Sequence, residues 1–138
     1  MPRIELLDWG RAREQAAPIR FAVFVEEQGV PFEIELDEYD AVSIHAVAFD
    51  ADKAVGTGRL LPDGHIGRMA VLAAFRGKGI GAALLEALMK AAKARGDVET
   101  VLSAQVSAVP FYREHGFQAE GEEYMEAGIR HQTMRKTL

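Results

Sequence analysis

Residues 69–81 read MAVLAAFRGKGIG, an apolar segment that leads through a glycine-rich turn into a region of helical periodicity. The first amides of a helix lack partners and the helix dipole is positive there, so this end stabilises a bound anion. Glycine lets the backbone approach a ligand and adopt a positive φ. Arg76 and Lys78 add positive charge, and an arginine can donate to two phosphate oxygens at once. The stretch therefore predicts a phosphate site at a strand–turn–helix junction.

Two common nucleotide motifs do not fit this turn. A P-loop requires GxxxxGK[ST], but Lys78 is followed by Gly79, so no hydroxyl is available for magnesium. A dinucleotide fingerprint requires GxGxxG, and its third glycine is replaced by Ala82 in one register and by Leu84 in the other. The pattern that does fit is RxxGxG, from Arg76 to Gly81.

The composition is that of a globular domain. The 138 residues are 49% hydrophobic and 27% charged, and we expect a single domain over residues 1–138. The absence of cysteine excludes disulfides, thiolate metal sites and a cysteine nucleophile, and no metal is expected. No apolar run reaches about 20 residues and the N-terminus does not resemble a signal peptide, so we expect a cytoplasmic protein without a membrane partner. The net charge of −5 argues against nucleic-acid binding.

Strand and helix patterns alternate along the chain. We expect strands at residues 3–7, 43–49, 54–61, 65–72 and 98–105, helices at about 11–27, 80–95 and 108–115, and a hairpin through Tyr124 and residues 129–134. Pro18 is expected to kink or split the first helix. Hairpins give antiparallel pairs, whereas a crossover helix between two strands implies a parallel pair. The predicted fold is α/β (α+β), a mixed, mostly antiparallel twisted sheet of six to seven strands with helices on both faces and one parallel pair.

A second pattern supports a specific ligand for the glycine-rich turn. Residues 105–117 read QVSAVPFYREHGF. Together the two stretches resemble the GCN5-related N-acetyltransferases (GNAT), in which RxxGxG opens a helix beside the CoA pyrophosphate and NxxAxxFYxxxGF follows the fifth strand. Five positions match with the correct spacing, namely Ala108, Phe111, Tyr112, Gly116 and Phe117. Gln105 stands where asparagine is usual. Two motifs in the right order are more specific than either alone.

A third segment narrows the resemblance. Residues 20–31 read RFAVFVEEQGVP, and ELDEYD at 35–40 and His45 follow. This order is similar to the ElaA/YjcF-like branch of the family, and GIRHQTM at 128–134 fits the closing strand of that branch, so the resemblance spans nearly the whole chain. Ala73 departs from the proline that the family often has, which we expect to loosen the loop slightly.

The resemblance implies acetyl-CoA as co-substrate. Its pantetheine arm is expected to pair with the backbone of Met69, Ala70 and Val71, where the sheet splays, and the Val71 N–H would face the thioester oxygen. Such an oxyanion donor is typically worth about 3–4 kcal/mol. The pyrophosphate is expected at the turn, and the predicted set of cofactor-binding residues is completed by Arg76, Gly77, Lys78, Gly79, Ile80, Gly81, Ala82, Gln105, Phe111 and Tyr112.

Acetyl transfer to an amine requires a neutral nucleophile and a protonated leaving thiolate. Tyr112 is the candidate general acid, because the usual tyrosine pKa of about 10 lies near the roughly 8.5 of a thiol. An alkylamine of pKa about 10.4 is neutral only about once in 2,500 at pH 7, so a base is expected. Glu26, Glu27, His45 and His131 are the candidates. Glu27 is preferred because it lies in the branch-specific segment near the expected acceptor cleft.

Residues 26–40 contain seven carboxylates and no lysine or arginine, a run that is usually a solvated loop but beside the acceptor cleft would favour cationic amines. The leading hypothesis is an acetyl-CoA-dependent N-acetyltransferase, in which a primary amine of a small molecule or peptide attacks the thioester directly. A catalytically inactive acyl-CoA-binding or sensing module is the alternative, and a generic nucleotide binder is a third hypothesis. Exposed edge strands make a homodimer reasonable.

Overall fold

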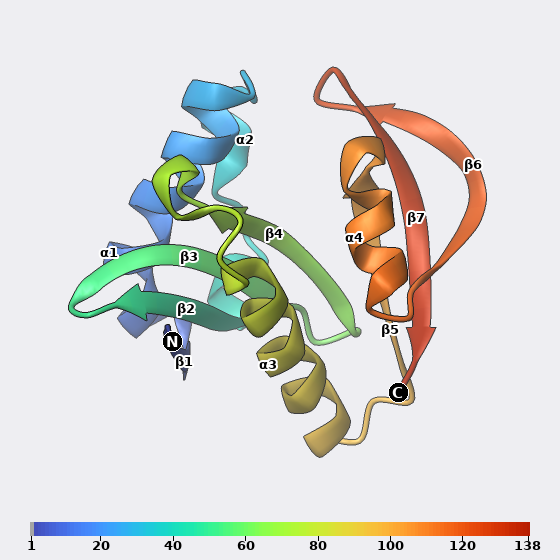
Figure 1. Cartoon of the computed structure of the whole chain (residues 1–138), viewed down its shortest axis with the longest axis horizontal. Coiled ribbons are helices and arrows are strands. Elements are labelled where there is room, and N and C mark those ends of the chain that lie inside the picture. Colours follow the sequence, from blue (N-terminus) through green and yellow to red (C-terminus); the bar gives the residue numbers. More distant parts are fainter. Residues whose placement is uncertain (1) are drawn as a thin grey trace.

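The computed structural model describes residues 2–138, which form a seven-stranded sheet in the order β1-β2-β3-β4-β5-β7-β6 (Figure 1). Every neighbouring pair is antiparallel except β4 and β5. The predicted mixed sheet with one parallel pair is therefore confirmed. The strands are β1 (Arg3–Leu7), β2 (Ile44–Asp50), β3 (Lys53–Leu60), β4 (His65–Val71), β5 (Glu99–Gln105), β6 (Gln118–Glu126) and β7 (Ile129–Thr137).

The first helix begins at Asp8, whose carboxylate accepts a hydrogen bond from the Arg11 amide at 3.0 Å. It is α-helical over α1 (Trp9–Arg20) and continues as the π-helix η1 (Phe21–Glu27). The expected split at Pro18 is wrong, because the helix runs through it and its hydrogen-bond pattern changes only at Phe21, whereas the expected kink stays a prediction. Pro18 is exposed, so water can hydrate the carbonyl that the missing proline N–H leaves free.

The remaining helices are α2 (Phe32–Glu35), α3 (Ile80–Ala94) and α4 (Val109–Glu114), with short 3₁₀ turns η2 (Asp40–Val42), η3 (Ala73–Phe75) and η4 (Val106–Ala108). Four residues are too few to show a helical period, and α2 was accordingly missing from the elements expected from the sequence. None of the helices in residues 2–138 has both the length and the apolar character needed to cross a membrane.

The helices cover both faces of the sheet, as predicted (Figure 1). Successive residues of a strand point to opposite faces. On β2, Ala46 and Ala48 belong to the core cluster that contains the leucines of α3 and the aromatic residues after β5, whereas Val47 and Phe49 pack with Ala12 of α1. The helix α3 thus lies on one face of the first four strands and α1 on the other.

The predicted hairpin at the end of the chain is confirmed and is longer than expected, since β6 and β7 have nine residues each. Its turn contains Ala127 and Gly128, both with positive φ (51° and 77°). This is the signature of a two-residue turn of type I′, whose twist matches that of the strands. The hairpin turn brings the end of β6 and the start of β7 to the edge of the cavity described below.

Candidate active site

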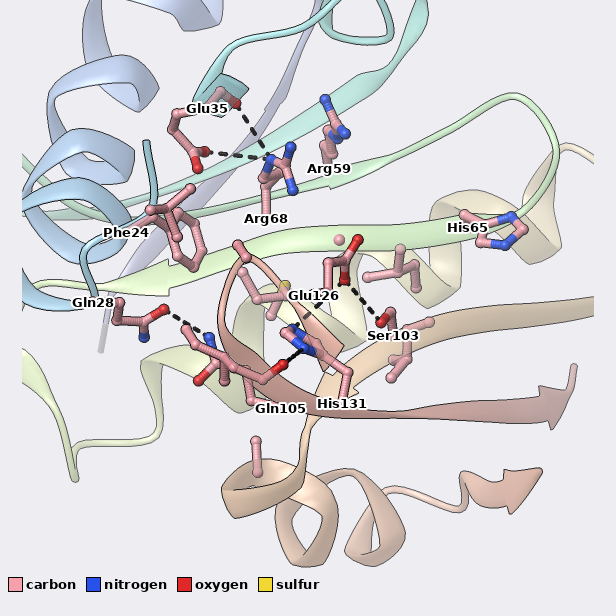
Figure 2. Close-up of a pocket in the computed structure, with 18 of the residues that line it drawn as sticks. Phe24, Gln28, Glu35, Arg59, His65, Arg68, Ser103, Gln105, Glu126 and His131 are labelled. Carbon is pink, nitrogen blue, oxygen red and sulfur yellow. Dashed lines mark hydrogen bonds and ion pairs between the residues drawn. The ribbon is translucent and has the colours of Figure 1, made fainter. Parts of the chain in front are cut away.

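The two parallel strands at the centre of the sheet are joined only at one end. Residue pairs His65–Val101 and Ile66–Leu102 link β4 to β5, and beyond them the strands diverge. A cavity of about 440 Å³ occupies the gap and is lined by Met69 of β4, Ser103 and Gln105 of β5, and residues from η1, α2, α4 and β7 (Figure 2). Its size is suitable for a small ligand.

A bulge in β4 accompanies this divergence. Arg59 pairs with Gly67 and Thr57 with Ala70, so Arg68 and Met69 together lie opposite Gly58. Arg68 has φ of 50°, a left-handed conformation that is strained for a side chain other than glycine. A Cβ at Gly58 would clash with the Met69 sulfur, so the glycine admits the Met69 side chain. The Arg68 guanidinium lies toward the opposite wall, beside Glu35 (Figure 2).

The glycine-rich turn has the backbone expected of an anion site. Gly77 and Gly79 have φ of 78° and 81°, and Gly79, the N-cap of α3, has no side chain that could bond the first helical amides. A Cβ on Gly81 would lie 3.7 Å from the Phe111 ring, which places the start of α3 against α4. The structure thus brings together the two predicted sequence motifs.

The predicted cofactor residues divide into two groups by position. Met69, Gln105 and Tyr112 line the cavity. The others lie around the turn or contribute their side chains to packing: Ala70 and Ile80 are buried, Val71, Phe111 and Ala82 are half-buried, and Lys78 lies over the Phe75 ring. For Ala70 and Val71 only the backbone was expected to contact the cofactor, so their side-chain packing does not conflict with the prediction.

Glu27 lies at the turn and is not among the residues that line the cavity. Its carboxylate accepts two hydrogen bonds from Arg76, at 2.9 and 2.8 Å, and the Arg76 Nε donates to the Val71 carbonyl at 2.9 Å. Both side chains are partly exposed. The contact joins η1 to the glycine-rich turn. It pairs Glu27, the predicted base, with Arg76, which was predicted to bind phosphate.

Tyr112 is buried on α4 and lines the cavity, with Phe111 and Phe117 at its ring edges. Burial raises the pKa of Tyr112 to about 12, and no hydrogen bond or charge within residues 2–138 contributes to the shift. The phenol therefore stays protonated at neutral pH, so it retains a hydrogen that it can donate.

The other three candidate bases differ in position. Glu26 is exposed on η1. His45 is buried outside the cavity, with Nε2 2.8 Å from the Asp40 carbonyl oxygen and its ring against Trp9. Burial lowers the pKa of His45, although Asp40 opposes the shift. Of the four candidates, His131 is the one that lines the cavity.

The acidic segment is largely neutralised by arginines that the sequence analysis did not connect to it. Arg20, buried on α1, contacts Glu35 at 3.0 Å and Asp40 at 2.6 Å. Arg59 of β3 binds Asp37 at 2.7 and 3.0 Å and Asp40 at 2.9 Å. With Glu27 bound to Arg76, four of the seven carboxylates are paired, so the run gives little support to a preference for cationic acceptors.

Arg68 completes this cluster by contacts at 3.3 Å to Glu35 and 3.4 Å to Asp37. One signal in the sequence pointed to the cluster, namely an arginine at position 20 within a helical face that also carries Ala16, Ile19 and Val23. Such a face is buried, and a buried arginine requires anionic partners.

A hydrogen bond joins two residues that line the cavity. The Gln105 amide donates to the Gln28 side-chain oxygen at 2.7 Å, which joins the end of β5 to the end of η1 (Figure 2). Phe24, Gln28 and Ile34 also line the cavity. Gln28 belongs to the branch-specific segment of residues 20–31, but no sequence signal paired it with Gln105.

A known protein family matches most of this chain, including the glycine-rich turn and the helix of Tyr112. The model of the acetyltransferase (GNAT) domain family matches residues 13–138. This chain belongs to that family. The uncharacterized N-acetyltransferase YjcF of Bacillus subtilis is 43% identical to it over 122 residues, which are 86% of this chain and 87% of the relative.

Solved structures of other proteins have the same fold as this chain. An acyl-CoA N-acyltransferase from Pseudomonas aeruginosa superposes on this chain with a TM-score of 0.88 and 30% sequence identity. ElaA from Escherichia coli superposes with a TM-score of 0.87 and 27% identity. Each superposition covers 99% of both chains. The CoA-dependent acyl-homoserine lactone synthase BjaI, solved with isopentyl-CoA, has a TM-score of 0.82 over 99% of this chain and 83% of its own. Its identity of 17% shows a common fold alone.

The GNAT family and the ElaA/YjcF-like branch were both predicted from the three sequence segments, and both predictions are confirmed. The protein is thus an acyltransferase by family, and acyl-CoA is the co-substrate type of this family.

Proposed function

We propose that the protein is an acetyl-CoA-dependent N-acetyltransferase that transfers an acetyl group to a primary amine of a small molecule or peptide. The observation that carries the proposal is the divergence of β4 from β5 beside an uncapped helix N-terminus, with Tyr112 in the cavity between them. An extended ligand can hydrogen-bond to the free edges of diverging strands while its phosphates lie at the helix end.

In this proposal each residue has a defined task. The amides at the start of α3, with Arg76 and Lys78, bind the pyrophosphate. The backbone of Met69, Ala70 and Val71 pairs with the pantetheine arm, and the Val71 N–H stabilises the charge that develops on the thioester oxygen. The amine attacks the carbonyl carbon, the carbon–sulfur bond breaks, and Tyr112 protonates the departing sulfur.

The raised pKa of Tyr112 changes the energetics expected from the sequence. A phenol of pKa about 12 is a weaker acid than a thiol of about 8.5, and donation to a fully hydrated thiolate would cost about 5 kcal/mol. Inside the cavity the sulfur also loses water, which raises its own proton affinity and narrows this difference. Tyr112 therefore suits protonation of a sulfur that leaves within the cavity rather than in solvent.

The contact between Glu27 and Arg76 leads us to expect a binding effect from Glu27. In the Glu27→Gln variant the guanidinium loses a competing carboxylate and is freer to bind phosphate. We expect the KM for acetyl-CoA to fall about two- to fivefold, the size of an exposed ion pair, with kcat within about threefold of the wild type. Steady-state kinetics with varied acetyl-CoA measure both constants.

The neighbouring Glu26→Gln variant is the matched control, because Glu26 is exposed and its loss should leave both constants unchanged. A fall in kcat of about a hundredfold or more in Glu27→Gln, with an unchanged KM, would instead support Glu27 as the general base.

Release of free CoA thiol in the presence of a panel of primary amines tests the proposed function itself. Turnover with at least one amine, dependent on acetyl-CoA, is the expected result. Acetyl-CoA binding without turnover on any amine would favour the inactive binding module. Thermal stabilisation by ATP or NAD equal to that by acetyl-CoA would favour a general nucleotide binder.

A further inference from the structure

We propose that Glu126 and His131 bind the ammonium group of the acceptor, and that His131 Nε2 removes the proton that must leave before the amine can attack. This inference rests on the proposed acetyltransferase function and assigns the base that the function requires. It is carried by the hydrogen bonding of the His131 ring, by the acceptor atom that faces it, and by the position of both groups in the cavity.

Hydrogen bonding determines the tautomer of the His131 ring. The ring nitrogen Nδ1 lies 2.7 Å from the carbonyl oxygen of Ile129. A carbonyl oxygen only accepts hydrogen bonds, so Nδ1 must carry a hydrogen. In the neutral ring, Nε2 then holds the lone pair. The carbonyl of Ile129, the first residue of β7, thus fixes which nitrogen is basic.

The Glu126 carboxylate lies near Nε2 of His131. The Glu126 carboxylate oxygen lies 3.7 Å from it, beyond hydrogen-bond distance. The Ser103 hydroxyl donates to the same carboxylate oxygen at 3.3 Å and also contacts the Tyr124 hydroxyl. A neutral imidazole nitrogen and a carboxylate are both acceptors, so their juxtaposition leaves a place for a cationic N–H donor. A protonated primary amine has the charge and the hydrogens that this place requires.

Neighbouring strands position His131 at the cavity. His131 pairs with Gln105 at the end of β5 and with Tyr124 on β6, and its ring is inclined by 22° to the Tyr124 ring, with the ring centroids 6.0 Å apart. The His131 residue is 8% exposed, and both Glu126 and His131 line the cavity that also contains Tyr112 (Figure 2). The other titratable groups that line this cavity are Glu35, Arg59, His65 and Arg68.

The arrangement gives a complete proton balance. One proton of the ammonium group moves to Nε2, and the freed lone pair forms the new carbon–nitrogen bond. The carbon–sulfur bond then breaks, and the thiolate receives the hydroxyl proton of Tyr112. The acylated nitrogen, which still carries an excess proton, returns one to the phenolate. His131 releases its proton to water, so acetyl-CoA and an ammonium ion yield an amide, CoA thiol and one proton.

The His131→Asn variant tests the assignment, because the asparagine amide can keep the donor to the Ile129 carbonyl but has no basic nitrogen in place of Nε2. We expect kcat/KM for an alkylamine found in the panel to fall about a hundredfold at pH 7, the usual effect of a general base. The deficit should shrink to within about threefold near pH 10, where much of the amine is already neutral. A deficit independent of pH, or no deficit, would overturn the proposal.

Three further measurements separate the possible failures. His115→Asn, outside the cavity lining, should keep the wild-type pH profile. Glu126→Gln removes an exposed carboxylate and should raise the KM for the alkylamine about tenfold. An arylamine is neutral at pH 7, so its KM should change less than about twofold in this variant.

Nitrogen NMR of the histidine rings should show His131 with its hydrogen on Nδ1. A hydrogen on Nε2 in the neutral ring would overturn the inference. No turnover with any amine would overturn the proposed function, and this inference with it.

Discussion

Replacement of Tyr112 by phenylalanine should reduce kcat about 10²–10⁴-fold, the range expected when a general acid is removed. The ring would stay between Phe111 and Phe117, so the packing of α4 should be preserved. Burial alone raises the pKa of Tyr112, so the lost hydroxyl leaves no protein partner unsatisfied within residues 2–138. Thiol release measures kcat, and calorimetric titration measures the affinity for acetyl-CoA, which should change less than about twofold.

Phe111→Leu is a useful companion variant, because it alters the same helix without removing a proton donor. It should weaken packing and acetyl-CoA binding more than the chemical step. If Tyr112→Phe retained wild-type kcat while Phe111→Leu did not, Tyr112 would have a packing role and the leaving thiolate would be protonated by another group.

The second large effect is expected on stability. Arg20→Met should lower the free energy of unfolding by about 3–5 kcal/mol, because the side chains of Glu35 and Asp40 are 98% buried and would each lose a cationic partner. The Arg20 guanidinium also donates to the Glu35 backbone carbonyl at 2.6 Å, and that acceptor would be left without this donor. Chemical denaturation monitored by circular dichroism measures the difference.

Arg13→Met is the matched control, because Arg13 is exposed on the same helix and the same residue types are exchanged. We expect a change below about 0.5 kcal/mol there. Equal effects at the two positions would show that helix propensity rather than the buried cluster determines the loss.

The same cluster should make the protein less stable in acid. Burial opposes ionisation of Asp37 and Asp40, but hydrogen bonds and charges from Arg59 and Arg20 outweigh it and hold the pKa of both below its ordinary value of 3.8. Their stabilisation is present above pH 3.8 and is lost as the pH falls through the lowered values. Burial disfavours the charged imidazolium and lowers the pKa of His45 below 6.5, so the contribution of His45 to stability also decreases in acid, beginning near that pH.

Glu35 acts in the opposite direction. Burial raises its pKa above 4.5 despite the neighbouring arginines, so its contribution is greatest below pH 4.5 and declines as the pH rises through the raised value. Asp37, Asp40 and His45 lose stabilisation in acid, whereas Glu35 gains it. We therefore expect the chemical denaturation midpoint to fall overall as the pH is lowered from about 6.5 to about 3. A midpoint that rises over this interval would show that Glu35 dominates the cluster.

The fold was predictable because its signals are local. Apolar periodicity identified α3, and the glycines at 77, 79 and 81 identified the turn before it. The strands on either side of α3 then required a parallel pair. Local signals could not predict how far that pair extends, because neither the end of the pairing after Ile66 nor the left-handed conformation of Arg68 has a sequence pattern.

The candidate site was predictable in part for the same reason. Tyr112 and the turn belong to contiguous motifs, whereas the partners of the charged residues come from distant segments. Glu27 and Arg76 are 49 residues apart, and Gln28 and Gln105 are 77 apart. The run of carboxylates at residues 26–40 was predicted to be a solvated loop, because no spacing rule connects it to Arg20 and Arg59.

The short pairing between β4 and β5 also affects how the protein opens. Two residue pairs join the sheet of β1–β4 to that of β5–β7, so the backbone hydrogen bonds between the halves are few, and the shared core around α3 carries most of their coupling. Segments joined in this way tend to unfold as separate cooperative units. A ligand that hydrogen-bonds to both diverging strands would make them a single unit, so that occupancy of the cavity is reflected in slower amide exchange throughout the sheet.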